Sequence, residues 1–224
     1  MQPILPMNMF TNIQSNWLGN KFDSSNVFSY LGKPLEAFLN DLLTDLGVVD
    51  SPVIHGNVHP STFINGRVFI AEGAKVEPTA FIEGPCIIGP GSEIRHGAYI
   101  RGCVFVGANA VVGHTTEVKG SIFLDKAKAG HFAYVGDSIL GQNVNLGAGT
   151  KLANLKLKNN EVFFLDPVTN KKVGSGLRKF SAVLGDNAQT GCNSVLSPGT
   201  LLFPGTMVMS CVHYRGTLKE GMAK

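Results

Sequence analysis

The sequence of 224 residues lacks the features that mark several classes of protein. No apolar run approaches the roughly 18 residues that a membrane-spanning helix needs, and the beginning, MQPILPMNMF, has no charged region followed by a hydrophobic one. We therefore expect no membrane span. The net charge is only +3 without a long basic run, which argues against nucleic acid as a partner. The four cysteines form no CxxC pair, so we expect reduced thiols in a cytoplasmic protein.

Glycine, by contrast, is abundant, at 27 residues, which favours a backbone with many tight turns. A hydrophobic rhythm accompanies it, because an apolar residue recurs at every sixth position and mostly a small or β-branched residue follows four positions later. A period of six fits neither a helix nor a simple strand and indicates a solenoid, in which three hexads make one triangular coil of 18 residues. The apolar positions are Val58, Ile64, Ile70, Val76, Ile82, Ile88, Ile94, Ile100, Val106, Val112, Val118 and Leu124.

The rhythm slips once and is then interrupted by an insertion. From Leu124 the next aliphatic position is Leu140, sixteen residues on, where a full coil needs eighteen. The polar stretch 155–183 then leaves the rhythm, and its sequence predicts a hairpin that turns near Asp166 and Pro167. Loops inserted into solenoids gather on one face, which often binds ligands.

These observations divide the chain into three parts. We expect an N-terminal extension with one helix over residues 1–52, a β-helix over 53–212 with the excursion 155–183, and a tail over 213–224. The helix is predicted from Pro34, with leucines at three- and four-residue spacing, to Gly47. Its single apolar stripe is expected to pack against an end or side of the coil, or against a second subunit.

Periodicity also places charged side chains. Arg101 and Lys119 are 18 residues apart, so they are expected to stack in successive coils, where an anion such as phosphate would offset their repulsion. The alternative is that Glu117 or another exposed carboxylate neutralises them. His96 and His114 stack in the same way, which raises the question of zinc, but no third histidine has the spacing of β-helix zinc enzymes. We interpret that pair as surface histidines and predict no metal site.

His131 and Tyr134 lie on the slip between the two runs of repeats. We expect the slip to turn both side chains towards the face that carries Arg101 and Lys119. A histidine is the natural general base for removing a proton from an attacking amine or hydroxyl. A structural role for this histidine is the alternative from position alone.

The stretch KAGHFAYVGDSILGQNVNLGAGT, residues 128–150, carries a family resemblance. It resembles the acetyltransferase domain of the bifunctional enzyme that makes UDP-N-acetylglucosamine, without a gap over residues 101–154. Short stand-alone β-helix proteins described as related to UDP-N-acetylglucosamine pyrophosphorylase look more similar still, sharing GHxxYVGDSILG and a later motif at 176–200. The resemblance implies an all-β, left-handed parallel β-helix of hexapeptide repeats that assembles as a homotrimer, with the site in the groove between subunits.

The resemblance also implies roles for individual residues. In the family's pattern, His131 falls on the catalytic base; Arg101 and Lys119 on the sugar-phosphate cations; Tyr134, Asn145 and Asn154 on substrate-binding positions; and Ala148 on the backbone amide that contacts the acetyl thioester. The implied activity is transfer of an acyl group, in the family acetyl from acetyl-CoA, to the amine of an amino-sugar phosphate such as glucosamine-1-phosphate.

Two departures qualify that expectation. After Asn154 this chain continues Leu-Lys-Leu where the bifunctional enzyme has Tyr-Asp-Gly, so the family's lysine has only Arg178 and Lys179 as nearby candidates. Residues 1–57 contain no glycine-rich nucleotide loop, so no uridylyl transfer is expected. The alternative function is a non-catalytic trimeric β-helix that binds a sugar nucleotide or partners a separate nucleotidyltransferase. A zinc hydratase would require a metal near His96 and His114.

Overall fold

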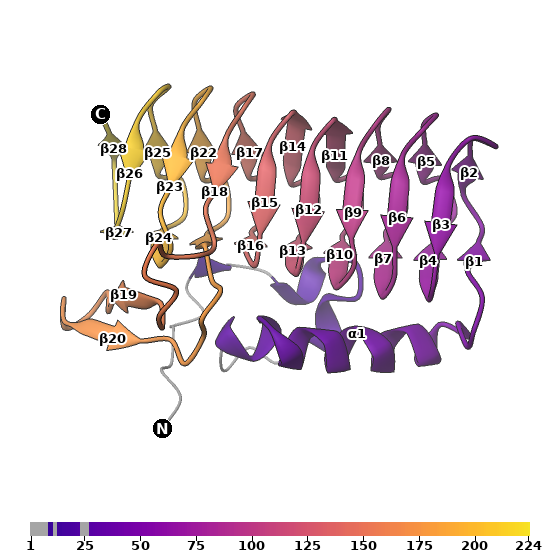
Figure 1. Ribbon diagram of the computed structural model, residues 1–224, viewed down its shortest axis with the longest axis horizontal. Coiled ribbons are helices and arrows are strands. Elements are labelled where there is room, and N and C mark those ends of the chain that lie inside the picture. The colour runs from indigo at the N-terminus through magenta and orange to yellow at the C-terminus, as the bar shows by residue number, and fades with distance from the viewer. Residues whose placement is uncertain (1–8, 11–12, 23–26) are drawn as a thin grey trace.

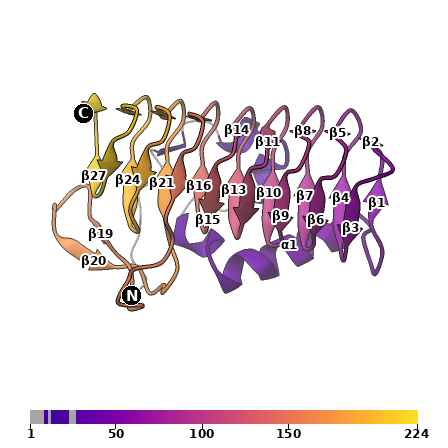
Figure 2. The same cartoon turned by 45° about the horizontal axis from the view of Figure 1, so that its top comes forward.

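The computed structural model describes residues 9–10, 13–22 and 27–224 of the chain. Three parallel sheets wind around one axis as a left-handed triangular coil, and successive coils follow one another along the long axis of the molecule (Figures 1 and 2). The predicted β-helix of hexapeptide repeats is therefore confirmed. None of the helices in the described part of the chain is long and apolar enough to span a bilayer.

Each coil contributes one strand to each sheet, except that the last coil ends with its strands in sheets A and B. Sheet A contains β1 (Val53–Ile54), β4 (Val68–Ile70), β7 (Cys86–Ile88), β10 (Val104–Val106), β13 (Ser121–Phe123), β16 (Ile139–Leu140), β21 (Ala182–Leu184), β24 (Thr200–Leu202) and β27 (Thr217–Leu218). Sheet B contains β2 (Asn57–Val58), β5 (Lys75–Val76), β8 (Glu93–Ile94), β11 (Val111–His114), β14 (Lys128–His131), β17 (Asn145–Leu146), β22 (Gln189–Thr190), β25 (Met207–Val208) and β28 (Met222–Ala223). Sheet C contains β3 (Phe63–Asn65), β6 (Phe81–Glu83), β9 (Tyr99–Arg101), β12 (Glu117–Lys119), β15 (Tyr134–Gly136), β18 (Lys151–Leu152), β23 (Val195–Leu196) and β26 (His213–Tyr214).

The interior of the coil is built from the predicted hexad positions. Every such position from Ile70 to Val118 belongs to the interior hydrophobic cluster, and the partly buried Val58 and Ile64 pack against it, because a period of six brings the same side-chain direction back once per sheet. Strands β26, β27 and β28 pair with the preceding coil, so the coil continues through residues 213–224, the segment expected to be a tail.

The slip differs from the prediction. Phe123, not Leu124, points inward, in register with Val106 and Leu140, while Leu124 packs outside the coil. The single coil of sixteen residues is in fact two successive coils of 17, as the pairings of Val106 with Phe123 and of Phe123 with Leu140 show. Each of these two coils is one residue shorter than the usual 18, and the missing residue is at the corner between sheets C and A.

Positive φ angles allow these shortened corners. Gly120, at φ +55°, forms the first, and Asp137, at φ +46°, forms the second. Aspartate tolerates this left-handed backbone better than most residues with a side chain. The shortening therefore lies on either side of the segment that carries His131 and Tyr134, and the spacing within that segment is regular.

The N-terminal segment covers the outer face of sheet A (Figure 1). It contains η2 (Ile13–Ser15), η3 (Gly19–Lys21), η4 (Val27–Tyr30) and α1 (Lys33–Asp45). Proline at the second position suits the first turn of α1, and Gly47 follows its end at φ +77°, so the predicted helix is confirmed. The apolar stripe of the helix packs on the side of the coil, where outward residues such as Phe105 and Ile122 replace the usual polar ones.

The excursion between β18 and β21 folds back on the same side. Strands β19 (Phe163–Leu165) and β20 (Lys172–Gly174) pair antiparallel, which confirms the hairpin predicted to turn at Asp166 and Pro167. Phe164 and Phe180 contact the ring of Phe28 at centroid distances of 5.0 and 5.4 Å. The excursion and the N-terminal segment therefore stabilise each other.

Arg67 fastens the end of α1 to the coil. Its guanidinium donates to the carbonyl of Val48 at 2.6 Å, to Asn40 Oδ1 at 2.9 Å and to Thr44 Oγ1 at 2.9 Å. We expect Arg67→Ala to lower the free energy of unfolding by about 2 kcal/mol, because a buried carbonyl loses a charged donor. Urea denaturation would measure this. Arg95→Ala is the control, since its pair with Glu93 is exposed and worth about 0–1 kcal/mol; equal losses would contradict the assigned role.

Candidate functional site

Two ion pairs occupy the ends of neighbouring strands in sheet C. Arg101 Nη1 lies 2.6 Å from Glu117 Oε1, and Lys119 Nζ lies 3.2 Å from Asp137 Oδ2. The two cations lie in one column, as the spacing predicts, because β9 and β12 pair without a shift. The hydrogen bond that Arg101 donates to Glu117 raises the pKa of Arg101 above its ordinary value. Each cation therefore faces a carboxylate, in line with the alternative that carboxylates neutralise the pair.

A hydrogen-bonded chain links this column to Tyr134. The Tyr134 hydroxyl donates to Asn154 Oδ1 at 3.3 Å, and Asn154 Nδ2 donates to Asp137 Oδ2. Burial raises the pKa of the Tyr134 hydroxyl, and the carboxylates of Asp137 and Glu117 raise it further. The hydroxyl therefore stays protonated at neutral pH and can donate a hydrogen bond.

Two glycines make room for this chain of side chains. A Cβ atom on Gly136 would lie 2.7 Å from the Tyr134 hydroxyl and 2.9 Å from Asn154 Nδ2. A Cβ atom on Gly120 would lie 2.7 Å from Asp137 Oδ1. Because real Cβ atoms do not approach that closely, both positions need glycine for the present arrangement.

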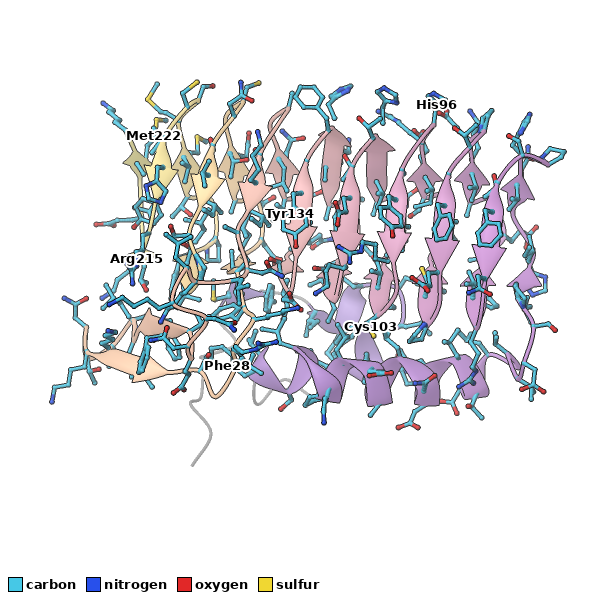
Figure 3. All side chains as sticks on the ribbon, in the orientation of Figure 1. Phe28, His96, Cys103, Tyr134, Arg215 and Met222 are labelled. Carbon is cyan, nitrogen blue, oxygen red and sulfur yellow. The ribbon has the colours of Figure 1, made fainter. Side chains whose placement is uncertain are left out.

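His131 lies at the ridge between sheets B and C, in register with His114. The rings of His96 and His114 stack at a centroid distance of 5.2 Å, and Figure 3 shows His96 on this ridge. His114 Nδ1 lies 2.9 Å from the carbonyl oxygen of His96, whereas the exposed imidazole of His131 has no hydrogen-bond partner among the described residues. The side chain of His131 therefore takes its direction from its place in the column after His96 and His114, and not from the shortened corners.

Asn145 and Ala148 lie on the coil that follows His131. Asn145 is exposed on the outer face of sheet B, beside Lys128. Ala148 lies at the ridge, where its carbonyl accepts from Asn193 N at 2.8 Å and the next residue, Gly149, donates to the His131 carbonyl at 3.0 Å. Within the described part of the chain, the N–H of Ala148 has no acceptor.

The structure thus divides the predicted site residues between two faces. Arg101, Lys119, Tyr134 and Asn154 form one connected cluster on sheet C (Tyr134 is labelled in Figure 3). His131 and Ala148 lie at the ridge between sheets B and C. Asn145 lies beyond this ridge, on the outer face of sheet B.

Asp137 is the residue that the sequence reasoning missed. It bridges Lys119 and Asn154, and its side chain is almost buried. Its only signal in the sequence was the spacing of 17 residues that places it at a shortened corner.

The loop after Asn154 follows its own course. Lys156 Nζ donates to the Glu161 carbonyl and lies over the Phe163 ring, 4.6 Å from its centroid. Arg178 Nη1 donates to Asn159 Oδ1 at 3.1 Å, and Lys179 pairs through its backbone with Leu155. These partners lie within the excursion. Among the described residues, no group of three histidine, cysteine or acidic side chains is arranged to hold a metal ion.

Comparison with known proteins agrees with this architecture. The family described as the GMPPB C-terminal domain matches residues 82–213. A bifunctional sugar-1-phosphate nucleotidylyltransferase/acetyltransferase of Sulfurisphaera tokodaii is 38% identical over 97 residues, which are 41% of this chain and 24% of that protein. The bifunctional protein GlmU of Methanococcus aeolicus is 40% identical over 76 residues, 34% of this chain and 18% of its own length. This chain thus spans a quarter or less of these curated relatives.

Among solved structures, a hexapeptide transferase family protein from Anaplasma phagocytophilum superposes with a TM-score of 0.32 at 18% identity, covering 78% of this chain and 82% of that one. The curated relatives confirm the resemblance to the bifunctional acetyltransferase, and the family match extends over more than half of the chain. The chain therefore belongs to the family of the GMPPB C-terminal domain.

Proposed function

We propose that the protein is an acyl-CoA-dependent N-acyltransferase that acts on an amino-sugar phosphate, with acetyl-CoA as the acyl donor and glucosamine-1-phosphate as the type of acceptor. The observation that carries this proposal is the ridge between sheets B and C. There the exposed imidazole of His131 lies one coil from the N–H of Ala148, and neither group has a hydrogen-bond partner among the residues that the structure describes. The name of the Sulfurisphaera tokodaii relative, which includes acetyltransferase, supports the same reaction.

The chemistry needs only these groups and the two substrates. The His131 imidazole accepts a proton from the amine as the nitrogen attacks the thioester carbonyl carbon, and the carbon–nitrogen bond forms. The Ala148 N–H donates to the carbonyl oxygen while it carries negative charge. The carbon–sulfur bond then breaks, and the proton held by His131 passes to the departing CoA thiolate.

The cluster on sheet C would hold the acceptor. Tyr134 and Asn154 offer hydrogen bonds to sugar hydroxyls, and Asn145 would contact the substrate from sheet B. Arg101 and Lys119 would bind the phosphate, for which their contacts to Glu117 and Asp137 must loosen, since those carboxylates would otherwise repel it.

Assembly as a cytoplasmic homotrimer is part of the proposal, with each site in a groove completed by a neighbouring subunit. An aromatic row on sheet C supports self-association. Phe63 and Phe81 stack at 4.7 Å, Tyr99 follows at 5.3 Å, and both Phe63 and Tyr99 are exposed. A second copy would remove this row from water.

The second candidate function is a non-catalytic β-helix that binds a sugar nucleotide or partners a separate nucleotidyltransferase. The ion pairs favour the form that partners a separate nucleotidyltransferase, because Arg101 and Lys119 already face carboxylates and in this arrangement offer no open anion site to a sugar phosphate or a sugar nucleotide. The same experiment distinguishes the two functions.

We expect His131→Ala to reduce acyl transfer at least about 100-fold, because a general base contributes 10²–10⁴-fold. The measurement follows CoA release from acetyl-CoA with a panel of amino-sugar phosphates. His114→Ala is the matched control, since His114 stands one coil away in the same column with Nδ1 held by a carbonyl, and it should keep most of the activity.

Equal losses in the two variants would contradict the role of His131 as base. No CoA release by the wild type with any acceptor, together with saturable binding of a sugar nucleotide, would replace the enzyme by the second candidate.

A further inference from the structure

A cavity of about 280 Å³ lies between the β19–β20 hairpin and the last coils of the β-helix. Phe163, Leu165 and Lys172 line it from the hairpin, while Gly199 and Arg215 line it from the corners between sheets C and A. Thr217 Oγ1 donates to the Leu165 carbonyl at 2.6 Å and so holds the hairpin against the coil. Figure 3 shows Arg215 on the side of the coil that faces the hairpin. The cavity therefore forms only where the hairpin packs against the last coils.

Positive charge gathers at this cavity. The Nζ atoms of Lys156 and Lys172 each lie 4.6 Å from the centroid of the Phe163 ring. The pKa of Lys156 is lowered by partial burial and by the charges of Lys172 and Arg215, so the three cations are close enough to repel one another. Within the described residues, neither Lys172 nor Arg215 forms an ion pair.

The carboxylates of the excursion are engaged elsewhere. Glu161 attracts Lys156, but its Oε1 atom accepts the N–H of Gly176 at 2.8 Å. Asp166 Oδ1 accepts the N–H groups of Val168 and Thr169 at 2.9 and 2.6 Å. The cations that line the cavity therefore keep most of their charge for a ligand from outside.

We propose that this cavity binds the diphosphate group of a small-molecule ligand, with Lys172 and Arg215 as direct ligands and Lys156 adding to the positive field. The planar fork of arginine takes two phosphate oxygens, and lysine supplies a mobile point charge. Gly216, which also lines the cavity, carries no side chain that would keep the anion from the backbone. This site is separate from the proposed acyl-transfer residues and does not depend on that reaction.

The size of the cavity defines the ligand class. Sites for drug-sized ligands occupy about 300–1,000 Å³, so this one accommodates a diphosphate and leaves the remainder of the ligand outside. Two cations matched to two phosphoryl groups should bind diphosphate more tightly than a single phosphate, because each added charge adds Coulomb attraction.

Calorimetric titration of the full chain with inorganic diphosphate at about 0.15 M salt tests the site. We expect saturable binding that is weaker for inorganic phosphate, and a dissociation constant about tenfold higher in Arg215→Gln and in Lys172→Gln, since each removes a charge-assisted contact. Titration with CoA, which carries a diphosphate, shows whether the acyl donor is the source: CoA affinity that falls in parallel in both variants assigns it, whereas unchanged CoA affinity assigns the cavity to another ligand.

Lys171→Gln is the matched control, because Lys171 precedes Lys172 in the same hairpin and does not line the cavity. It should leave the diphosphate affinity within about twofold of the wild type, as expected for an exposed charge screened by salt. The proposal is overturned if the wild type shows no diphosphate binding, or if Lys171→Gln loses as much affinity as Arg215→Gln. Either result is independent of whether His131→Ala affects CoA release.

Discussion

Gly113→Ala is expected to destabilise the protein by about 3 kcal/mol or more, at the upper end of what overpacking costs. A Cβ atom at this position would lie 1.7 Å from the carbonyl oxygen and 2.1 Å from the carbonyl carbon of Gly130 on the next coil. Both are backbone atoms of Gly130 in β14, the strand that pairs with β11, so no side chain can swing away to relieve the clash. The coils would have to separate beside His114 and His131. Thermal denaturation followed by circular dichroism should show a midpoint lower by roughly 6 °C or more.

Gly130→Ala is the matched control for this substitution. Gly130 faces Gly113 across the same strand pair, yet nothing lies within 4 Å of the Cβ atom that alanine would add, and its φ is not in the left-handed region. We therefore expect a change within about 0.5 kcal/mol, or slight stabilisation from a less flexible unfolded chain. If the two alanine variants unfolded at the same temperature, close approach of the coils at Gly113 would not limit stability.

Phe105→Ala is expected to lower the free energy of unfolding by about 3–5 kcal/mol, the cost of removing a fully buried phenylalanine ring. Phe105 points outward from sheet A and is 0% exposed. Its ring stacks on Trp17 at 5.8 Å and meets Phe22 edge-on at 5.4 Å. The loss should therefore fall on the contact between the coil and the N-terminal segment. Trp17 is the single tryptophan of the chain, so its fluorescence reports directly on that contact during urea denaturation.

Tyr99→Ala supplies the comparison for Phe105. Tyr99 also points outward, but from sheet C, where its side chain is 41% exposed. Its replacement should leave the Trp17 spectrum unchanged, because Tyr99 lies in the row with Phe63 and Phe81 on another face, whatever the loss of that row does to self-association. A contrary outcome is that Phe105→Ala changes the free energy of unfolding by less than about 1 kcal/mol, or that the Trp17 unfolding curves of the wild type, Phe105→Ala and Tyr99→Ala coincide. Either result would mean that the N-terminal segment contributes little to the stability of the coil.

The six-residue period predicts the positions of some residues of the candidate site and not of others. A constant period places Arg101 and Lys119 in one column because coil stacking converts sequence distance into position. The partners of these cations do not follow from that count. Glu117 and Asp137 reach them through side-chain conformation and, for Asp137, through a corner shortened by one residue. A pattern of apolar residues carries no information on either.

The sequence by itself determined the hexapeptide β-helix, the helix that begins near Pro34 and the hairpin at Asp166, since each depends on local periodicity or turn chemistry. Only the tertiary structure decided that Phe123 rather than Leu124 fills the interior, because both are apolar neighbours and the outer face of sheet A is itself covered. It likewise decided the pairing of Lys119 with Asp137 and the cavity beside Arg215, since both join segments whose distance in space no periodicity encodes.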